Sequence, residues 1–138
     1  MDFSSINFLA VLVAGVASFA LGALWYSPVL FGKAWQKELG YTDEYLQSGN
    51  MGVTFGTSFV LMLIMSLGMA MLLPKIAGDT LNLRSGLSNG ILIGLLFVGT
   101  SMGVNYLYQR KSFKLWAIDA IYQILFLGIM GMILGAWK

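Results

Sequence analysis

The sequence lacks cysteine and histidine altogether, and only 10% of its 138 residues are charged. Zinc sites, iron–sulfur clusters, histidine-ligated haem, thiol catalysis and Ser-His-Asp chemistry need one or both of the missing residue types. We therefore expect no metal and no other cofactor. An ordinary soluble domain is about 25% charged, and a net charge of +2 is too small to indicate a nucleic-acid partner. The composition excludes a soluble globular domain, a disordered chain and a nucleic-acid-binding protein.

The few charges are clustered, which leaves four long stretches with none. These stretches run from Phe3 to Gly32, Tyr45 to Pro74, Ser85 to Gln109 and Ala120 to Trp137. A membrane-spanning helix needs roughly 20 mostly apolar residues to cross a ~30 Å hydrocarbon core, and no stretch alternates as a β-barrel strand would. The sequence predicts one all-α integral membrane domain, residues 1–138, built as a four-transmembrane-helix bundle. Its predicted spans are about 6–26, 51–73, 86–108 and 115–137.

Proline is also scarce, and both prolines follow a predicted span. Because proline lacks an N–H and restricts the residue before it, it stops helices or begins new ones. Pro74 should therefore end the second span. Ser27 should cap a short interfacial amphipathic helix over residues 28–39, with Pro28 in its first turn and Gly40 as its C-cap.

Lysine and arginine in the short loops predict the orientation. Five of them follow spans one and three, whereas the opposite side carries three: Lys33, Lys37, Arg110, Lys111 and Lys114 against Lys75, Arg84 and Lys138. Since positive loops stay in the cytoplasm, we expect both termini outside it.

Small residues recur at four-residue spacing within the spans. The stripes are Ala10, Ala14, Ser18 and Gly22; Gly52 and Gly56; Gly86, Gly90 and Gly94; and Gly131 and Gly135. Membrane helices associate by close packing at such residues. The stripes predict packing within one chain or, alternatively, the seam of a homodimer. A bundle this small leaves little room for a pore, so we expect a homodimer with any conduction path between subunits.

Asp119 is the only charged residue inside a predicted span. A central carboxylate costs about 2.5–3.5 kcal/mol on insertion scales, and such residues usually face the bundle interior with a partner. Helical spacing places Tyr122 and Gln123 on the same face as Asp119. Counting outward from the turn between spans three and four puts Asn105 at a similar depth. The expected cation for Asp119 is Lys33 or Arg110.

The string LWYSPVLFGKAW, from Leu24 to Trp35, resembles the bacterial membrane family known as domain of unknown function 1761. An isolated Asp119 and Tyr122 in the last span and a tryptophan near the C-terminus extend the resemblance over nearly the whole chain. The resemblance implies a multi-pass protein of the bacterial cytoplasmic (inner) membrane, and it carries over no activity, substrate or catalytic residue. The residues of its structural motif are Ser27, Pro28, Phe31, Gly32 and Trp35.

Two interpretations of the polar cluster remain open. One is a buried ion pair and hydrogen-bond set that fixes helix register. The other is a binding site for a proton, a cation or a substrate near one membrane face. The residues of this binding hypothesis are Trp25, Tyr26, Lys33, Asn105, Asp119, Tyr122 and Gln123.

The leading functional hypothesis is binding or transport of a small molecule or ion in the lipid bilayer, by a homodimer. A non-catalytic interaction or structural protein is the first alternative. A lipid-modifying enzyme, with Asp119 and Tyr122 as acid–base groups, is the second. The enzyme is least favoured because a chain without histidine has only one intramembrane carboxylate to serve as its base.

Overall fold

Four long helices dominate the computed structural model, which describes residues 3–138. They are α1 (Phe8–Trp25), α4 (Met51–Ala77), the continuous helix formed by α5 (Leu83–Ile93), η2 (Gly94–Gly99) and α6 (Thr100–Tyr108), and α7 (Phe113–Ala136). Between α1 and α4 lie α2 (Gly32–Leu39) and α3 (Asp43–Ser48), and the short turn η1 (Gly78–Thr80) follows α4. Each long helix is apolar and long enough to cross a membrane. The predicted four-span, all-α membrane architecture is confirmed.

Side-chain caps explain where most of these helices begin. An asparagine, serine or threonine oxygen accepts a hydrogen bond from a backbone N–H two or three residues further on, which satisfies a donor that the first turn leaves free. The capping residues are Asn7, Thr42, Asn50, Asn82 and Ser112. Polar residues just outside the apolar runs thus set the start of every transmembrane helix.

The segment between α1 and α2 differs from the prediction. The helix begins at Gly32 rather than at Pro28, and Ser27 does not cap it. The Ser27 hydroxyl donates to the carbonyl of Leu24 instead, at 2.7 Å. The N–H of Phe31 reaches back to Trp25 O at 2.9 Å. These bonds hold Pro28 in a turn, so the helix starts four residues later than expected. Its predicted end is confirmed, because Gly40 is the C-cap, with a left-handed φ of 69°.

Pro74 does not end the second span, contrary to the prediction. Helix α4 continues to Ala77, with Pro74 inside its last turn. Proline removes one backbone hydrogen bond, and membrane helices tolerate this where neighbouring groups compensate. Here the N–H of Gly78 closes the turn onto the Pro74 carbonyl. The helix ends at Ala77, and the next residue, Gly78, adopts a positive φ of 53° that does not continue the helix.

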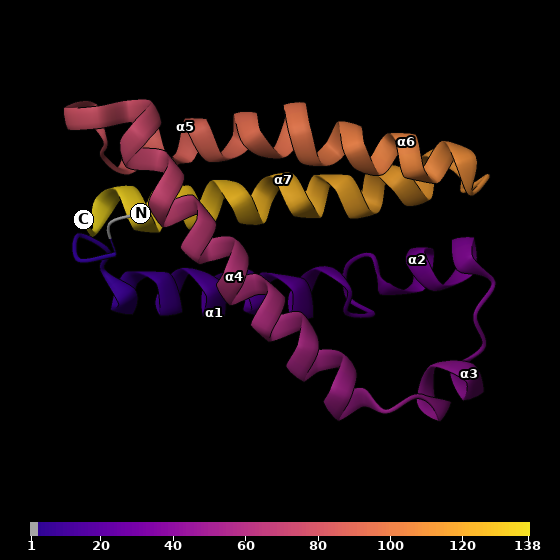
Figure 1. Ribbon diagram of the computed structural model, residues 1–138. Coiled ribbons are helices and arrows are strands. Elements are labelled where there is room, and N and C mark those ends of the chain that lie inside the picture. The colour runs from indigo at the N-terminus through magenta and orange to yellow at the C-terminus, as the bar shows by residue number, and fades with distance from the viewer. Residues whose placement is uncertain (1–2) are drawn as a thin grey trace.

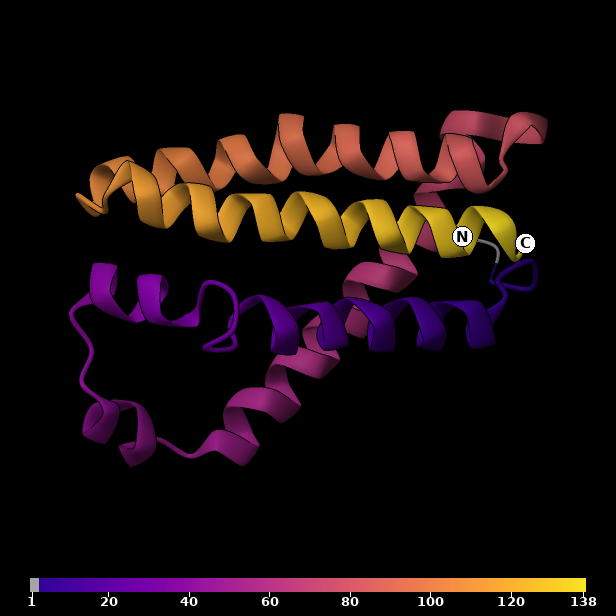
Figure 2. The same ribbon diagram turned by 180° about the vertical axis from the view of Figure 1, so that it is seen from behind.

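Helix α7 is the centre of the bundle (Figure 1). The continuous helix α5–η2–α6 runs antiparallel to α7 on one side, and α1 lies along the other (Figure 2). Helix α4 crosses this layer obliquely and diverges from it toward α3. The start of α1 and the C-terminus lie at the same end of the bundle, where the Asn7 side chain donates to Trp137 O at 3.2 Å.

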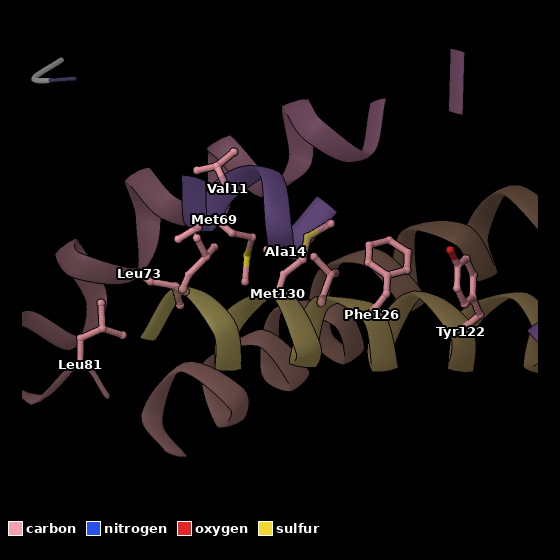
Figure 3. Close-up of a cluster of buried hydrophobic side chains, with 11 residues drawn as sticks. Val11, Ala14, Met69, Leu73, Leu81, Tyr122, Phe126 and Met130 are labelled. Carbon is pink, nitrogen blue, oxygen red and sulfur yellow. The ribbon is translucent and has the colours of Figure 1, made fainter. Parts of the chain in front are cut away.

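The apolar core lies where α1, α4 and α7 meet (Figure 3). Phe126 and Met130 of α7 are completely buried, and Leu73 of α4 packs with them. Tyr122 closes the cluster at the end remote from the termini. Two buried serines tie the helices across this core. Ser66 of α4 donates to the carbonyl of Val11 at 2.8 Å, and Ser18 of α1 bonds within its own helix and faces Phe126 O at 3.4 Å.

Glycines set the contact between α5 and α7. A Cβ atom added at Gly86 would lie 2.0 Å from the carbonyl oxygen of Gly131, and one at Gly90 would lie 2.2 Å from Leu127 O. The two backbones therefore touch without intervening side chains. The glycine stripe of the third span packs within the chain, as one of the two interpretations of the stripes predicted.

Candidate functional site

Asp119 is buried near the end of the bundle that is remote from the termini, with 8% of its surface exposed. Its two carboxylate oxygens accept hydrogen bonds from two tyrosines on different helices. The Tyr26 hydroxyl donates to Oδ1 at 2.6 Å, and the Tyr106 hydroxyl donates to Oδ2 at 2.5 Å. Such short O–H···O⁻ contacts are typical of charge-assisted hydrogen bonds, which are roughly twice as strong as neutral ones. The carboxylate thus joins α7 to the end of α1 and to α6.

The motif between Leu24 and Trp35 folds directly onto this part of α7. The indole N–H of Trp25 donates to Ile118 O at 3.0 Å, next to the Asp119 residue that Tyr26 bonds. Gly32 fits against the turn, since a Cβ atom there would lie 2.2 Å from Tyr26 O. The motif is therefore a tight turn that brings one indole and one phenol to two successive residues of α7.

Aromatic rings surround the Tyr26 phenol. Trp35 of α2 meets its ring edge-on, with ring centres 5.8 Å apart, and Tyr122 of α7 does so at 5.3 Å. The ring of Phe31 lies against Trp25 with centres 4.4 Å apart. Edge-to-face pairs of this kind add about 0.5–1.5 kcal/mol each beyond area burial. The two edge-to-face contacts hold Tyr26 in place beside Asp119.

Tyr106 reaches the carboxylate because of the π turn η2. The inward-facing glycines Gly86, Gly90 and Gly94 are spaced four residues apart. The next two are Gly99 and Gly103, so the step from Gly94 to Gly99 is five residues long. A π turn inserts one residue into an α-helix and rotates everything beyond it by about 100°. The face that continues from Gly103 therefore carries Tyr106. The Trp116 indole donates to the Gly99 carbonyl in this turn, at 2.9 Å.

The prediction that Asn105 faces Asp119 is therefore wrong. An uninterrupted α-helix from Gly94 would place Asn105 on the inward face, but the inserted residue leaves it exposed and brings in Tyr106. Sequence reasoning missed Tyr106 because counting outward from the turn gave the depth of Asn105 but not which face of the helix points inward. The signal was present, because the step from Gly94 to Gly99 breaks the four-residue spacing.

The other residues of the binding hypothesis lie at varying distances from the carboxylate. Tyr122 is buried, but its hydroxyl donates to Ser18 O at 3.1 Å and not to Asp119. Gln123, one residue further on, is half-buried. Lys33 is exposed on α2, and within residues 3–138 it forms no ion pair with Asp119. The expected cation is replaced by two phenol donors.

A cavity of about 240 Å³ lies on the outer side of Tyr106, between α6 and the start of α7. Apolar and aromatic side chains form most of its wall, and Lys111 and Ser112 lie at the turn that closes it. The lining residues are Gly103, Tyr106, Leu107, Lys111, Ser112, Phe113 and Trp116. Tyr106 therefore separates this cavity from the buried carboxylate.

The fold and the site together define a small multi-pass membrane protein with one buried, phenol-bound carboxylate. A family model described as a protein of unknown function, DUF1761, matches residues 9–135. The chain belongs to this family, as the resemblance in its sequence indicated. Comparison with curated proteins finds no match. Comparison with solved structures finds none either.

Proposed function

We propose that the protein binds a small cation, the proton included, at the carboxylate of Asp119 near one membrane face and transports it across the membrane. The observation that supports this most directly is the buried carboxylate, which has no cationic partner within residues 3–138. Removing an ion from water costs several kcal/mol even after relaxation. The two phenols offset part of this cost, and a cation or a proton would neutralise the remaining charge.

The surroundings of the carboxylate suit a cation. A positive group near the rings of Tyr26, Trp35 and Tyr122 gains about 0.5–2 kcal/mol from each ring face that it contacts. Phenol hydroxyls both donate and accept, so Tyr26 and Tyr106 can pass a proton to or from the carboxylate without leaving it. An intramembrane carboxylate in such a setting is a functional candidate on general grounds.

A flux experiment tests this proposal. We would compare the wild type with Asp119→Asn in proteoliposomes that contain a pH-sensitive dye, and drive proton entry with a potassium diffusion potential. The control is Asp79→Asn, which removes an exposed carboxylate in η1 at the opposite end of the bundle. We expect flux in the wild type and the control, and the protein-free rate in Asp119→Asn.

A second measurement covers cations other than the proton. Tetramethylammonium is titrated into the purified protein while tryptophan emission is followed, because Trp25 and Trp35 lie beside the site. Equal flux in all three proteins, together with no emission change on titration, would reject the proposal.

A structural role for the cluster is the second candidate, and the full pairing of Asp119 favours it. Both carboxylate oxygens already have a donor, and the bonds connect three helices. On this view Asp119→Asn lowers thermal stability, while the wild type shows neither flux nor cation binding. The same two measurements therefore separate the candidates.

The proposal includes assembly as a homodimer in the bacterial inner membrane, with both termini outside the cytoplasm. We place the dimer interface on the first half of α4, because a Cβ atom at Gly56 would meet nothing within 4 Å and the nearby Val53 and Val60 are exposed. The chain contains no cysteine, so a single Gly56→Cys variant is a clean cross-linking probe. Cross-linked dimers are expected from Gly56→Cys and not from Ser88→Cys, which lies on the exposed face of α5.

A further inference from the structure

The cavity between α6 and α7 lies at the depth where lipid headgroups would meet the protein. It is closed by the turn at Lys111 and Ser112, which joins two transmembrane helices. Two exposed aromatic side chains lie at this end of the helices: Phe113, which lines the cavity, is 79% exposed, and Tyr108, the last residue of α6, is 87% exposed. Aromatic residues gather at the interface between hydrocarbon and headgroups. The cavity therefore opens toward lipid rather than toward the interior of the bundle.

The polarity of the cavity changes along the membrane normal. Gly103 and Leu107 line its deeper part, and Lys111 lies at the turn that follows α6. Lys111 forms no ion pair within residues 3–138. A phospholipid has the same order of polarity, with an anionic phosphate above apolar chains.

The turn carries a local excess of positive charge. Arg110 and Lys114 flank Lys111, and the carboxylate that contacts this turn belongs to Glu38, which accepts from the Ser112 hydroxyl at 2.6 Å. The bond to Glu38 uses the single hydrogen of the Ser112 hydroxyl, whose oxygen also accepts from the N–H of Leu115. Recognition of an anion therefore depends on Lys111 and on the free N–H groups of the first turn of α7.

The volume of the cavity suits part of a larger molecule. At about 240 Å³ it is smaller than the roughly 300–1,000 Å³ of a typical site for a whole drug-sized ligand. A phospholipid is compatible with this small volume, because only its phosphate and glycerol region would enter the cavity while its acyl chains remain in the bilayer.

We infer that this cavity binds one anionic phospholipid, with its phosphate at Lys111 and its glycerol region against Leu107 and Trp116. The site differs from the one at Asp119, which would attract a cation. Tyr106 is the wall between them.

The test measures retention of phosphatidylglycerol by the purified full-length protein, using native mass spectrometry, with phosphatidylcholine as the zwitterionic comparison. The wild type should retain one phosphatidylglycerol molecule in preference to phosphatidylcholine. Lys111→Gln should weaken retention about fivefold, the contribution of one juxtamembrane lysine. Lys111→Glu should weaken it further, because a carboxylate then faces the phosphate.

Two further variants separate the cavity from diffuse charge. Lys114→Glu changes the charge of the same turn equally but does not line the cavity, so it should retain the lipid. Leu107→Trp fills the cavity without changing charge. Leu107 is 78% exposed, which makes the larger side chain compatible with folding, and this variant should lose the lipid.

Three results would overturn the inference: equal retention of the two lipids by the wild type, equal losses in Lys114→Glu and Lys111→Glu, or unchanged retention in Leu107→Trp. Because none of these variants alters Asp119, the outcome does not depend on the flux experiment.

Discussion

Helix α4 and the helix α5–η2–α6 look alike in sequence but pack in different ways. Both are charge-free over most of their length, both contain glycines four residues apart, and both are long enough to cross a membrane. In α5 the glycines face α7 and bring the two backbones into contact. In α4 a Cβ atom at Gly56 or Gly68 would meet nothing within 4 Å. Four-residue glycine spacing by itself therefore does not predict that a helix packs closely against another.

The difference depends on what lies opposite each stripe. Helix α7 presents Gly128, Gly131 and Gly135 to α5, so small residues face small residues and the helices approach closely. Helix α4 instead meets the rest of the bundle through large side chains in its second half, Met69 and Leu73. A close helix pair needs two complementary stripes, and only one of these two helices has a partner with the second stripe in this chain.

The largest expected effect comes from filling one glycine in each helix. Gly90→Val should destabilise the protein by about 3 kcal/mol or more, because the new Cβ meets the Leu127 carbonyl at 2.2 Å and backbone cannot move aside as a side chain can. Gly56→Val should change the free energy of unfolding by less than about 0.5 kcal/mol, as surface substitutions usually do. Unfolding of the monomer by detergent titration measures both. Similar losses of unfolding free energy in Gly90→Val and Gly56→Val would show that the two helices do not differ in packing.

A smaller effect is expected from deleting Leu96, an exposed residue of η2. The deletion turns the π turn into an ordinary α-helical turn and rotates Tyr106 away from Asp119 by about 100°. In the wild type, Tyr106→Phe should cost about 1–3 kcal/mol through loss of a hydrogen bond to a buried carboxylate. In the deletion background the same substitution should cost almost nothing. A double-mutant cycle measures this coupling, and equal costs in both backgrounds would show that η2 does not position Tyr106.

The smallest expected effect tests the part of α4 that does pack. Ser66→Ala removes a buried hydrogen bond to Val11 O and should cost about 0.6 kcal/mol, the average for such bonds between membrane helices. The matched control is Ser88→Ala, since the Ser88 hydroxyl is exposed and bonds within its own helix. Thermal unfolding of the three proteins provides the measurement. If Ser88→Ala costs as much as Ser66→Ala, the bond from Ser66 to Val11 O does not anchor the second half of α4.

Much of the fold could be read from the chain without its structure. Charge-free stretches predicted all four spans, and polar residues at the start of the apolar runs cap the helices: Asn7, Asn50 and Ser112. The errors concern Ser27 and Pro74, whose effects depend on neighbours. Ser27 bonds back to α1 instead of capping α2, and Pro74 lies close enough to the end of α4 for its missing hydrogen bond to cost little.

The candidate site was predicted only in part. Scarcity of charge singled out Asp119, and the family-like motif between Leu24 and Trp35 placed Tyr26 in the binding hypothesis. The donor on span three was misassigned by one residue, because counting outward from the turn gives the depth of a residue but not the inward face, which depends on the π turn η2. The cation expected from the loops is absent from the carboxylate, since two phenols occupy both oxygens.

The sequence by itself determined the class of the protein, the number of its spans and the one residue that carries a buried charge, because each follows from local composition and the bilayer's demand for apolar helices. Only the tertiary structure decided which face of span three turns inward and which donors meet Asp119. The physical reason is that a one-residue π insertion is settled by contacts along the whole length of α7, from Gly131 opposite Gly86 to Trp116 opposite Gly99. No local pattern contains those contacts.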